Sequence, residues 1–367
     1  MPGGGRRERG EGSGVLASLR QLRSAALVGS ALLAIGAIVG ATLAGSGDAP
    51  TGSLVAAQAT SWSQLSPASS PPPRFSAALA GDAAGGLVLF GGAGTGRLLG
   101  DTWIWNGRTW RELALASSPS ARVAAAMAYD PRTRQLVLFG GEDRHGILAD
   151  TWTFDGSRWT RRFPATSPPA RFSSSMAYDP ASGLLVLFGG LGRHAYLDDT
   201  WTWTGSDWTL DRPAARPPAR LGASLAYDPA RRGLVLFGGS RLGYLADTWL
   251  WRGERWTELS PATSPPGRAG AAMAYDRGTG QLVLVGGCGT TGDLGDTWTL
   301  TGAGWVEASP GSALAARVDA SAAYDRGAGQ LVVFGGAARR ASLGDTWSWG
   351  TPPGVARHAT DRSGAQR

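Results

Sequence analysis

The chain has 367 residues, of which 56 are glycine, 16 are tryptophan and one is cysteine, and its net charge is +7. A single cysteine excludes both an intrachain disulfide and a zinc cluster built from cysteines. Residues 1–50 and 351–367 carry +2 each, so residues 51–350 keep +3, which is too little to indicate a nucleic-acid partner.

An uncharged segment of membrane length extends from residue 24 to residue 47, after a basic amino terminus, residues 1–23. A helix of about 20 residues crosses a bilayer core. The positive-inside rule then keeps residues 1–23 in the cytoplasm and places the rest of the protein outside. Two interpretations stay open: a retained transmembrane signal anchor, which the length favours, or a cleaved signal peptide, which makes the protein secreted. Gly36 and Gly40 match the GxxxG spacing of helix dimers, although an Ala- and Gly-rich segment produces that spacing by chance.

After a linker, residues 48–59, one sequence unit is repeated six times over residues 60–350. A glycine doublet marks each unit and recurs every 48 or 49 residues, which indicates a repeat fold. The doublets are Gly91-Gly92, Gly140-Gly141, Gly189-Gly190, Gly238-Gly239, Gly286-Gly287 and Gly335-Gly336. Residues 351–367 form a tail that we expect to be disordered.

The third unit shows the elements in order. Small residues at 171–177 predict a crowded innermost strand, and residues 178–180 (Tyr-Asp-Pro) predict a turn. The apolar run 184–188 predicts a strand buried on both faces. Residues 200–203 and the segment that begins at Trp208 predict the third and fourth strands. The sequence therefore predicts an all-β, six-bladed β-propeller with four antiparallel strands per blade.

The sixth unit ends without a fourth strand, but the chain offers one at its other end. Trp62 lies 48 residues before Trp110 and shares the sequence context of the fourth strands. We expect residues 60–65 to pair with residues 345–349, which closes the ring and removes an exposed sheet edge.

The glycine doublet followed by two tryptophans seven positions apart, such as Trp103 and Trp110, resembles the kelch repeat, with Trp where many kelch units have Tyr. The resemblance covers roughly residues 60–350. It implies a propeller similar to the central domain of galactose oxidase. We expect a monomeric propeller in a bacterial protein that its amino-terminal segment anchors to the membrane or exports.

Similar kelch propellers include copper oxidases of the galactose oxidase type and sialic-acid epimerases, so a carbohydrate-active kelch enzyme is one alternative. The residues do not support it. Only His145 and His194 lie outside the tail, no tyrosine partner is indicated for Cys288, and no GxSxG motif precedes a helix. We expect no catalytic residue, metal or cofactor. The favoured function is a non-catalytic interaction or ligand-binding module for a carbohydrate, an anionic polymer or a protein.

Residues that occur in all six units are interpreted as scaffold. The arginine that opens each unit is expected to hold backbone carbonyls or neighbouring aspartates, and the Asp-Thr pairs are expected to cap loops and strand starts. These arginines are Arg74, Arg122, Arg171, Arg220, Arg268 and Arg317, and the pairs run from Asp101-Thr102 to Asp345-Thr346.

Function is expected where the units differ, chiefly in the loops between the second and third strands. The candidate ligand-binding residues there are Arg97, Arg144, His145, Arg193, His194, Tyr196, Arg241, Tyr244, Arg339 and Arg340. Such loops converge on one face of a propeller, where guanidinium groups would bind an acidic glycan, a phosphate-bearing polymer or an acidic protein segment. The opposing interpretation is that arginine is simply the default soluble residue of a chain without lysine.

Asp319 is a further candidate, because the other units have Ser, Ala or Gly at its position. A single carboxylate near the propeller axis would either coordinate a cation or contact channel water. Both interpretations stay open.

Overall fold

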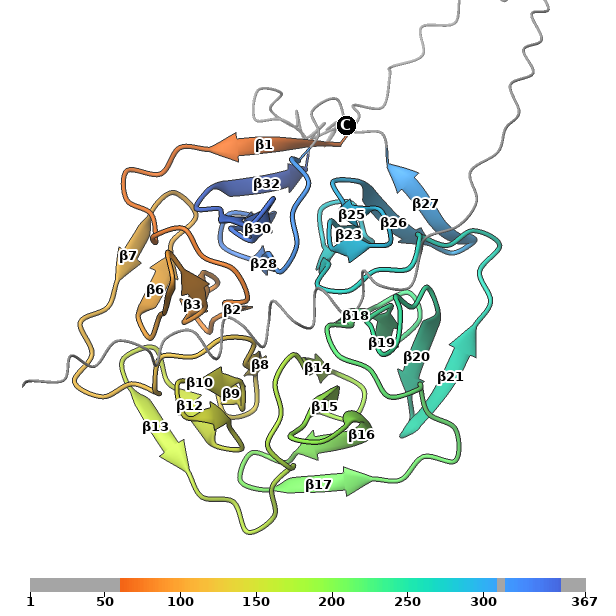
Figure 1. Cartoon of the computed structure of the whole chain (residues 1–367), viewed down its shortest axis with the longest axis horizontal. Coiled ribbons are helices and arrows are strands. Elements are labelled where there is room, and N and C mark those ends of the chain that lie inside the picture. Colours follow the sequence, from red (N-terminus) through yellow and green to blue (C-terminus); the bar gives the residue numbers. More distant parts are fainter. Residues whose placement is uncertain (1–59, 309–313, 351–367) are drawn as a thin grey trace, which may run out of the picture.

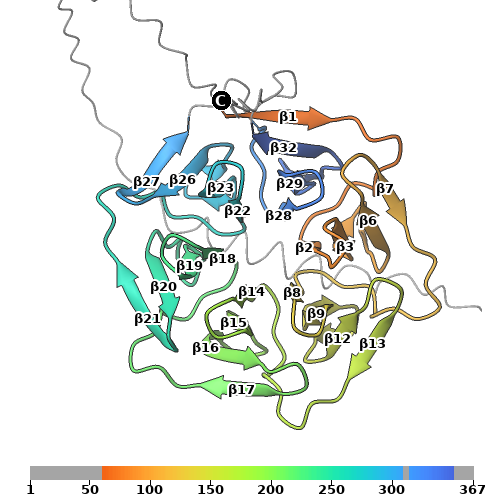
Figure 2. The same ribbon diagram turned by 180° about the vertical axis from the view of Figure 1, so that it is seen from behind.

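Six four-stranded antiparallel sheets surround a central channel in the computed structural model, which describes residues 60–308 and 314–350 (Figure 1). Figure 2 shows the opposite face of the same ring. All regular elements in the described part of the chain are strands. The predicted all-β, six-bladed propeller is therefore confirmed. Within the same residues no helix is long and apolar enough to cross a membrane, and the expected membrane segment, residues 24–47, lies outside them.

Each blade contributes one inner strand to the channel wall, followed by a second, a third and an outer strand. Blade 1 contains β2 (Ala78–Gly81), β3 (Leu87–Phe90), β6 (Thr102–Trp105) and β7 (Trp110–Glu112). Blade 2 contains β8 (Ala126–Asp130), β9 (Gln135–Phe139), β12 (Thr151–Phe154) and β13 (Trp159–Arg162). Blade 3 contains β14 (Ser175–Asp179), β15 (Leu184–Leu191), β16 (Tyr196–Trp203) and β17 (Trp208–Asp211).

The remaining three blades repeat this order. Blade 4 contains β18 (Ser224–Asp228), β19 (Gly233–Phe237), β20 (Thr248–Arg252) and β21 (Arg255–Leu259). Blade 5 contains β22 (Ala272–Asp276), β23 (Gln281–Val285), β26 (Thr297–Thr301) and β27 (Gly304–Ala308). Blade 6 contains β28 (Ser321–Asp325), β29 (Gln330–Phe334), β32 (Thr346–Gly350) and, from the start of the chain, β1 (Ser61–Leu65).

Short hairpins extend the connection between the second and third strands in four blades. They are β4 (Ala93–Gly94) with β5 (Arg97–Leu98), β10 (Glu142–Asp143) with β11 (Gly146–Ile147), β24 (Cys288–Gly289) with β25 (Gly292–Asp293), and β30 (Ala337–Ala338) with β31 (Ala341–Ser342). In blade 3 the long strands β15 and β16 take this place, with a register shift between Phe188 and Gly190.

The second strand of each blade is buried because neighbouring blades cover both of its faces. In β15, Leu185 and Leu187 pack with residues of blade 2, and Val186 and Phe188 pack with residues of blade 4. Successive side chains of a strand point to opposite faces, so a continuous apolar run is needed here. The core of the molecule is consequently a set of layers between the blades.

A buried tryptophan on each outer strand fixes that strand to the preceding blade. Trp208 lies against Trp203 of its own blade and against Phe139 of blade 2, with ring centroids 5.2 and 5.3 Å apart. Its Nε1 donates to Thr151 Oγ1 at 3.0 Å, which supplies the acceptor that a buried indole requires. The same bond joins every neighbouring pair of blades: Trp62 to Thr297, Trp110 to Thr346, Trp159 to Thr102, Trp256 to Thr200 and Trp305 to Thr248.

The ring is closed by the first and last strands of the described chain. Strand β1 pairs antiparallel with β32, with Trp62 opposite Trp349 and Leu65 opposite Thr346. The predicted closure is confirmed, with β1 beginning one residue later than expected. Sheet pairing and the bond from Trp62 to Thr297 of blade 5 thus hold the two ends of the propeller together.

The arginine that opens each unit forms a buried clamp. In blade 2, the Arg122 guanidinium is held against Asp150 by bonds of 2.6 and 2.9 Å and also donates to the Gly140 carbonyl. Trp152 Nε1 donates to the same carboxylate at 2.7 Å. Burial alone would raise the pKa of Asp150, but the hydrogen bonds and charge of Arg122 and the bond from Trp152 hold that pKa below its usual value. All six units repeat the clamp, as the scaffold interpretation predicted.

The glycine doublet is required where the clamp meets the next blade. Gly140 and Gly141 have φ values of 65° and 94°, in the left-handed region that favours glycine. A Cβ atom at Gly140 would lie 2.5 Å from the Arg171 carbonyl oxygen of blade 3. The doublet therefore allows one blade to approach the backbone of the next.

Candidate ligand-binding site

The central channel has two mouths, and the inner strands determine which residues line them. We call the end formed by the loops between second and third strands the hairpin mouth. The other end, formed by the turns that follow the inner strands, is called the tyrosine mouth. The candidate residues predicted from the sequence belong to the hairpin mouth.

The inner strand of blade 3 differs from its sequence prediction in a way that affects the tyrosine mouth. Residues 171–177 were predicted as the strand and residues 178–180 as the turn. In the structure β14 extends from Ser175 to Asp179, because Tyr178 pairs with Leu185 and Asp179 pairs with Leu184. Tyr178 is thus a residue of the channel wall and not of a turn.

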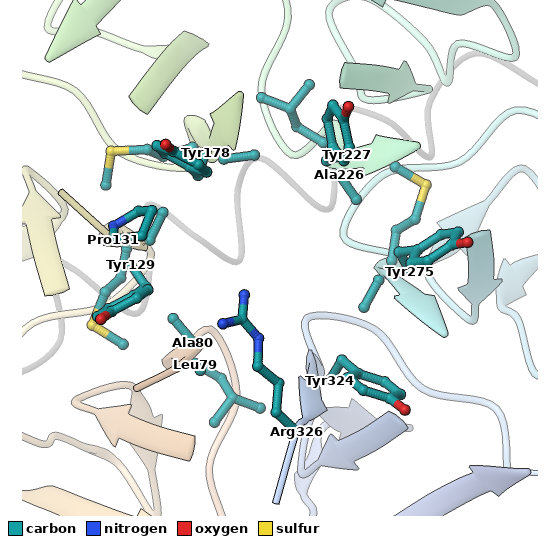
Figure 3. A pocket seen from close by; sticks show the side chains of 18 of the residues that line it. Leu79, Ala80, Tyr129, Pro131, Tyr178, Ala226, Tyr227, Tyr275, Tyr324 and Arg326 are labelled. Atoms are coloured by element: carbon teal, nitrogen blue, oxygen red, sulfur yellow. The ribbon is translucent and has the colours of Figure 1, made fainter. Parts of the chain in front are cut away.

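The same register places one tyrosine on the channel wall in each of blades 2 to 6. The five residues are Tyr129, Tyr178, Tyr227, Tyr275 and Tyr324, and they surround a cavity of about 630 Å³ (Figure 3). Met127, Met176 and Met273 lie among the other residues that line this cavity. Blade 1 has Gly81 at the tyrosine position, since Gly81 pairs with Leu87 as Tyr129 pairs with Leu136. The aromatic ring is therefore interrupted at blade 1.

Two of the five phenols have a raised pKa. Burial raises the pKa of Tyr227, and the charge of Asp179 in the preceding blade adds to the effect. Burial and the charge of Asp276 act in the same way on the pKa of Tyr324. Tyr227 and Tyr324 are therefore neutral phenols. Figure 3 shows the hydroxyl groups of the five tyrosines directed away from the middle of the mouth, so the aromatic rings and not the hydroxyls border the cavity.

Two arginines enter the tyrosine mouth on one side. Arg277 and Arg326 follow the last residue of the inner strands of blades 5 and 6, where blades 2, 3 and 4 have Pro131, Pro180 and Pro229. Both side chains are exposed and line the cavity. Figure 3 shows the Arg326 guanidinium reaching toward the middle of the mouth between Leu79 and Tyr324, beside the gap in the aromatic ring.

The mouth contains one acidic lining residue, Asp82 of blade 1. Its Oδ1 accepts hydrogen bonds from the backbone amides of Ala84 and Gly86, both at 2.9 Å, and so serves the turn after β2. The charged groups around the cavity are therefore two arginines and one aspartate that caps its own turn.

At the hairpin end the channel is bounded by a ring of backbone hydrogen bonds, one residue from each blade. Going round the axis, each amide donates to the carbonyl of the neighbouring residue at 2.8 or 2.9 Å; the ring residues are Ser76, Ala124, Ser173, Gly222, Gly270 and Asp319. Asp319 thus occupies the register position that the sequence assigned to it. It lines small cavities on both sides of the ring, of about 90 and 130 Å³.

The structure brings three of the sequence-predicted site residues together at the hairpin mouth. Tyr196, Tyr244 and Asp319 line the cavity of about 90 Å³, together with Cys288. The other candidates lie on separate exposed loop tips and do not line this cavity: Arg97, Arg144, His145, Arg193, His194, Arg241, Arg339 and Arg340. Arg144 Nε donates to the adjacent His145 Nε2 at 2.8 Å, and the Arg339 amide donates to Asp293 of blade 5.

Cys288 has a tyrosine neighbour that the sequence did not indicate. The Tyr244 hydroxyl lies 3.1 Å from Cys288 Sγ, and the contact joins the hairpin-mouth loops of blades 4 and 5. In the part of the chain that the structure describes, no three His, Cys, Asp or Glu residues are grouped so as to hold a metal ion. The contact of Tyr244 with Cys288 is a polar contact between two loops.

No protein-family model and no curated protein matches the chain. Strand pairing establishes the fold.

The tyrosine mouth was missed because its residues recur from unit to unit, and recurrence was interpreted as scaffold. Two signals in the sequence could have revealed it. The tyrosine is replaced by Gly81 in the first unit, and the Asp-Pro pair of units two to four becomes Asp-Arg at Arg277 and Arg326. Deviations within the most regular part of the repeat were thus as informative as the variable loops.

Proposed function

We propose that this protein is a non-catalytic ligand-binding module that takes saccharide rings into the tyrosine mouth. The observation that carries the proposal is the set of five tyrosines around a cavity of about 630 Å³. Flat aromatic faces stack on the apolar C–H faces of sugar rings. A concave, largely apolar site with a few polar groups is the usual form of a small-molecule site.

The proposal agrees with the kelch resemblance of the repeat, which links the chain to carbohydrate-active propellers by analogy of fold. Such an analogy is a weak warrant for function, so the argument depends on the tyrosine mouth itself. The basic amino terminus and the apolar segment 24–47 support a place outside the cytoplasmic membrane, where extracellular glycans are met.

The test is an oligosaccharide array probed with the full chain and with Tyr178→Ala and Tyr227→Ala. These two residues lie in adjacent blades of the uninterrupted part of the aromatic ring. Each substitution is expected to weaken saccharide binding about tenfold, because an aromatic stacking contact contributes roughly 1 kcal/mol or more. Tyr196→Ala, at the hairpin mouth, is the matched control and should bind as the wild type does. Absence of saccharide binding by the wild type, or normal binding by both variants, would reject the proposal.

The alternative is a carbohydrate-active kelch enzyme, and the contact of Tyr244 with Cys288 is the observation that favours it. The matching experiment is metal analysis of the purified protein with an assay for hydrogen peroxide on galactose-type alcohols. Bound copper together with peroxide production would show that the protein is an oxidase and not a binding module.

A further inference from the structure

The tyrosine mouth is asymmetric in charge as well as in shape, and the asymmetry indicates the kind of sugar that it binds. This inference rests on the proposed function. Blades 2, 3 and 4 present tyrosines next to prolines, which are neutral and rigid. Blades 5 and 6 present tyrosines next to Arg277 and Arg326, and blade 1 has no tyrosine.

Arg277 and Arg326 differ from the arginines that support the nearby turns. Arg132 lies 3.5 Å from Asp130, and Arg231 is paired with Asp228 at 2.6 Å, so both are bound to the aspartate of their own turn. Arg277 and Arg326 follow the corresponding aspartates directly, and neither takes part in an ion pair within residues 60–308 and 314–350. Both side chains line the cavity instead, and Figure 3 shows the Arg326 guanidinium directed toward its middle.

The missing tyrosine gives Arg326 its position. In blade 5, Arg277 lies near Tyr324 of the next blade and lowers the pKa of that phenol, against the larger effects of burial and Asp276. The blade that follows Arg326 has Gly81 in place of a tyrosine, so the side chain reaches toward the centre of the mouth (Figure 3). The hydrogen-bond donors of the Arg326 guanidinium thus lie where the circle of tyrosines is interrupted.

From this arrangement we infer that the preferred saccharide carries a carboxylate, as a uronic acid does. Sugar rings stack on individual tyrosines of blades 2 to 4, and a carboxylate of the saccharide accepts hydrogen bonds from Arg326 and Arg277. Arginine suits this role because its planar fork matches the two oxygens of a carboxylate. Asp82 also lines the cavity, and its negative charge repels a second negative charge on the saccharide. Two backbone amides donate hydrogen bonds to its Oδ1.

The experiment compares acidic sugars with neutral forms of the same sugars. Calorimetry with the full chain measures binding of trimers of galacturonate, glucuronate and mannuronate, each as the free acid and as the methyl ester, which keeps the rings and removes the charge. At least one acid trimer is expected to bind about tenfold or more tighter than its ester, since a hydrogen bond to a charged group contributes roughly 1.5–3 kcal/mol.

Variants locate the effect. Arg326→Gln combined with Arg277→Gln is expected to reduce acid binding to the level of the ester and to leave ester binding unchanged. Asp82→Asn is expected to tighten acid binding only. Arg339→Gln combined with Arg340→Gln on the hairpin mouth is the matched control, because it removes two arginine charges from the opposite face.

The possible failures are distinguishable. Equal binding of acids and esters overturns the inference and keeps the saccharide site. If no trimer binds and the oligosaccharide array shows no binding, the proposed function is rejected as well. Tighter binding of a glutamate-rich peptide than of any uronate trimer would assign the arginines to an acidic protein segment and overturn the inference.

Discussion

The backbone amide of Ser76 donates to the carbonyl of Asp319 at 2.9 Å, and this bond closes a ring of six around the channel axis. Every ring residue has a positive φ, between 52° at Ser76 and 65° at Gly270, although four of the six are not glycine. A left-handed conformation costs an ordinary residue roughly 1–2 kcal/mol. The packing of the blades therefore holds the backbone at the axis in this unfavourable conformation. Substitutions in the ring are expected to disturb the assembly of the blades.

Gly270→Ala is expected to destabilise the propeller more than Gly222→Ala, although both glycines have nearly the same φ. A Cβ at Gly270 meets Asp319 Oδ1 and lies 2.8 Å from Val318 Cγ2, whereas a Cβ at Gly222 has its nearest neighbour at 3.3 Å. We expect about 1 kcal/mol of destabilisation at Gly222 and roughly 2–3 kcal/mol at Gly270. Denaturant unfolding measures both. Adding Asp319→Gly should recover part of the loss at Gly270 only, and equal losses at the two sites would contradict the clash.

The arginine clamp predicts a second stability experiment. Arg171→Ala leaves the Asp199 carboxylate in place after removing a partner held at 2.6 and 2.7 Å. Breaking a buried pair in this way costs roughly 3–5 kcal/mol. Arg171→Lys keeps the charge but cannot form the two-pronged contact with the carboxylate. We expect the loss of unfolding free energy in this variant to be more than half of the loss in Arg171→Ala. Thermal unfolding of both variants checks the order, and a lysine variant as stable as the wild type would show that charge alone suffices.

The same clamps predict how the protein responds to acid. The clamp carboxylates, such as Asp199, have a folded-state pKa below the ordinary value of 3.8, because Arg171 and Trp201 outweigh the effect of burial. Their contribution to stability is nearly complete above about pH 5 and is lost as the pH falls from there through the lowered folded-state pKa. We expect unfolding below pH 4 to be steep, since six clamps titrate together. Asp199→Asn should make the slope measurably shallower in acid titrations followed by tryptophan fluorescence.

The repeat pattern predicted the blades, the closing strand and the scaffold role of the arginines, because each depends on features within one unit. The prediction of the tyrosine mouth depends on the residue at which each inner strand ends. Whether Tyr178 belongs to a turn or to the channel wall is decided by its pairing with Leu185, which strand propensity does not determine. The contact of Tyr244 with Cys288 joins residues 44 positions apart in separate blades, and nothing within one unit indicates it.

Asp211 on the outer strand of blade 3 predicts a pH dependence of the opposite sign. Burial, and secondarily the charge of Glu254, raises its pKa to about 6 despite a hydrogen bond from Thr202. The same register position is Leu65 in blade 6 and Leu259 in blade 4. The folded state binds the proton more tightly than the unfolded state, so stability falls as the pH rises from about 4 to about 6 and is then level.

Between pH 4.5 and 7.5 we expect the wild type to lose roughly 1–2 kcal/mol of its free energy of unfolding through this group. Asp211→Leu should abolish the loss and raise the stability at pH 7.5, because an apolar side chain suits the position. Urea unfolding at the two pH values measures both effects, and Asp207→Leu, at a nearby turn, is the control. A wild type equally stable at pH 4.5 and 7.5 would contradict the assignment.

Closure of the ring by β1 predicts the largest effect of all. Deleting residues 60–66 removes the partner of β32 and the bond from Trp62 to Thr297, and it exposes the edge of blade 6. We expect the deletion to abolish cooperative unfolding. Trp62→Ala should cost roughly 3–5 kcal/mol, since it empties a fully buried site. Gln64→Ala, at an exposed position of the same strand, should cost less than about 0.5 kcal/mol. A truncated protein that melts as sharply as the wild type would mean that the six blades hold together without this strand.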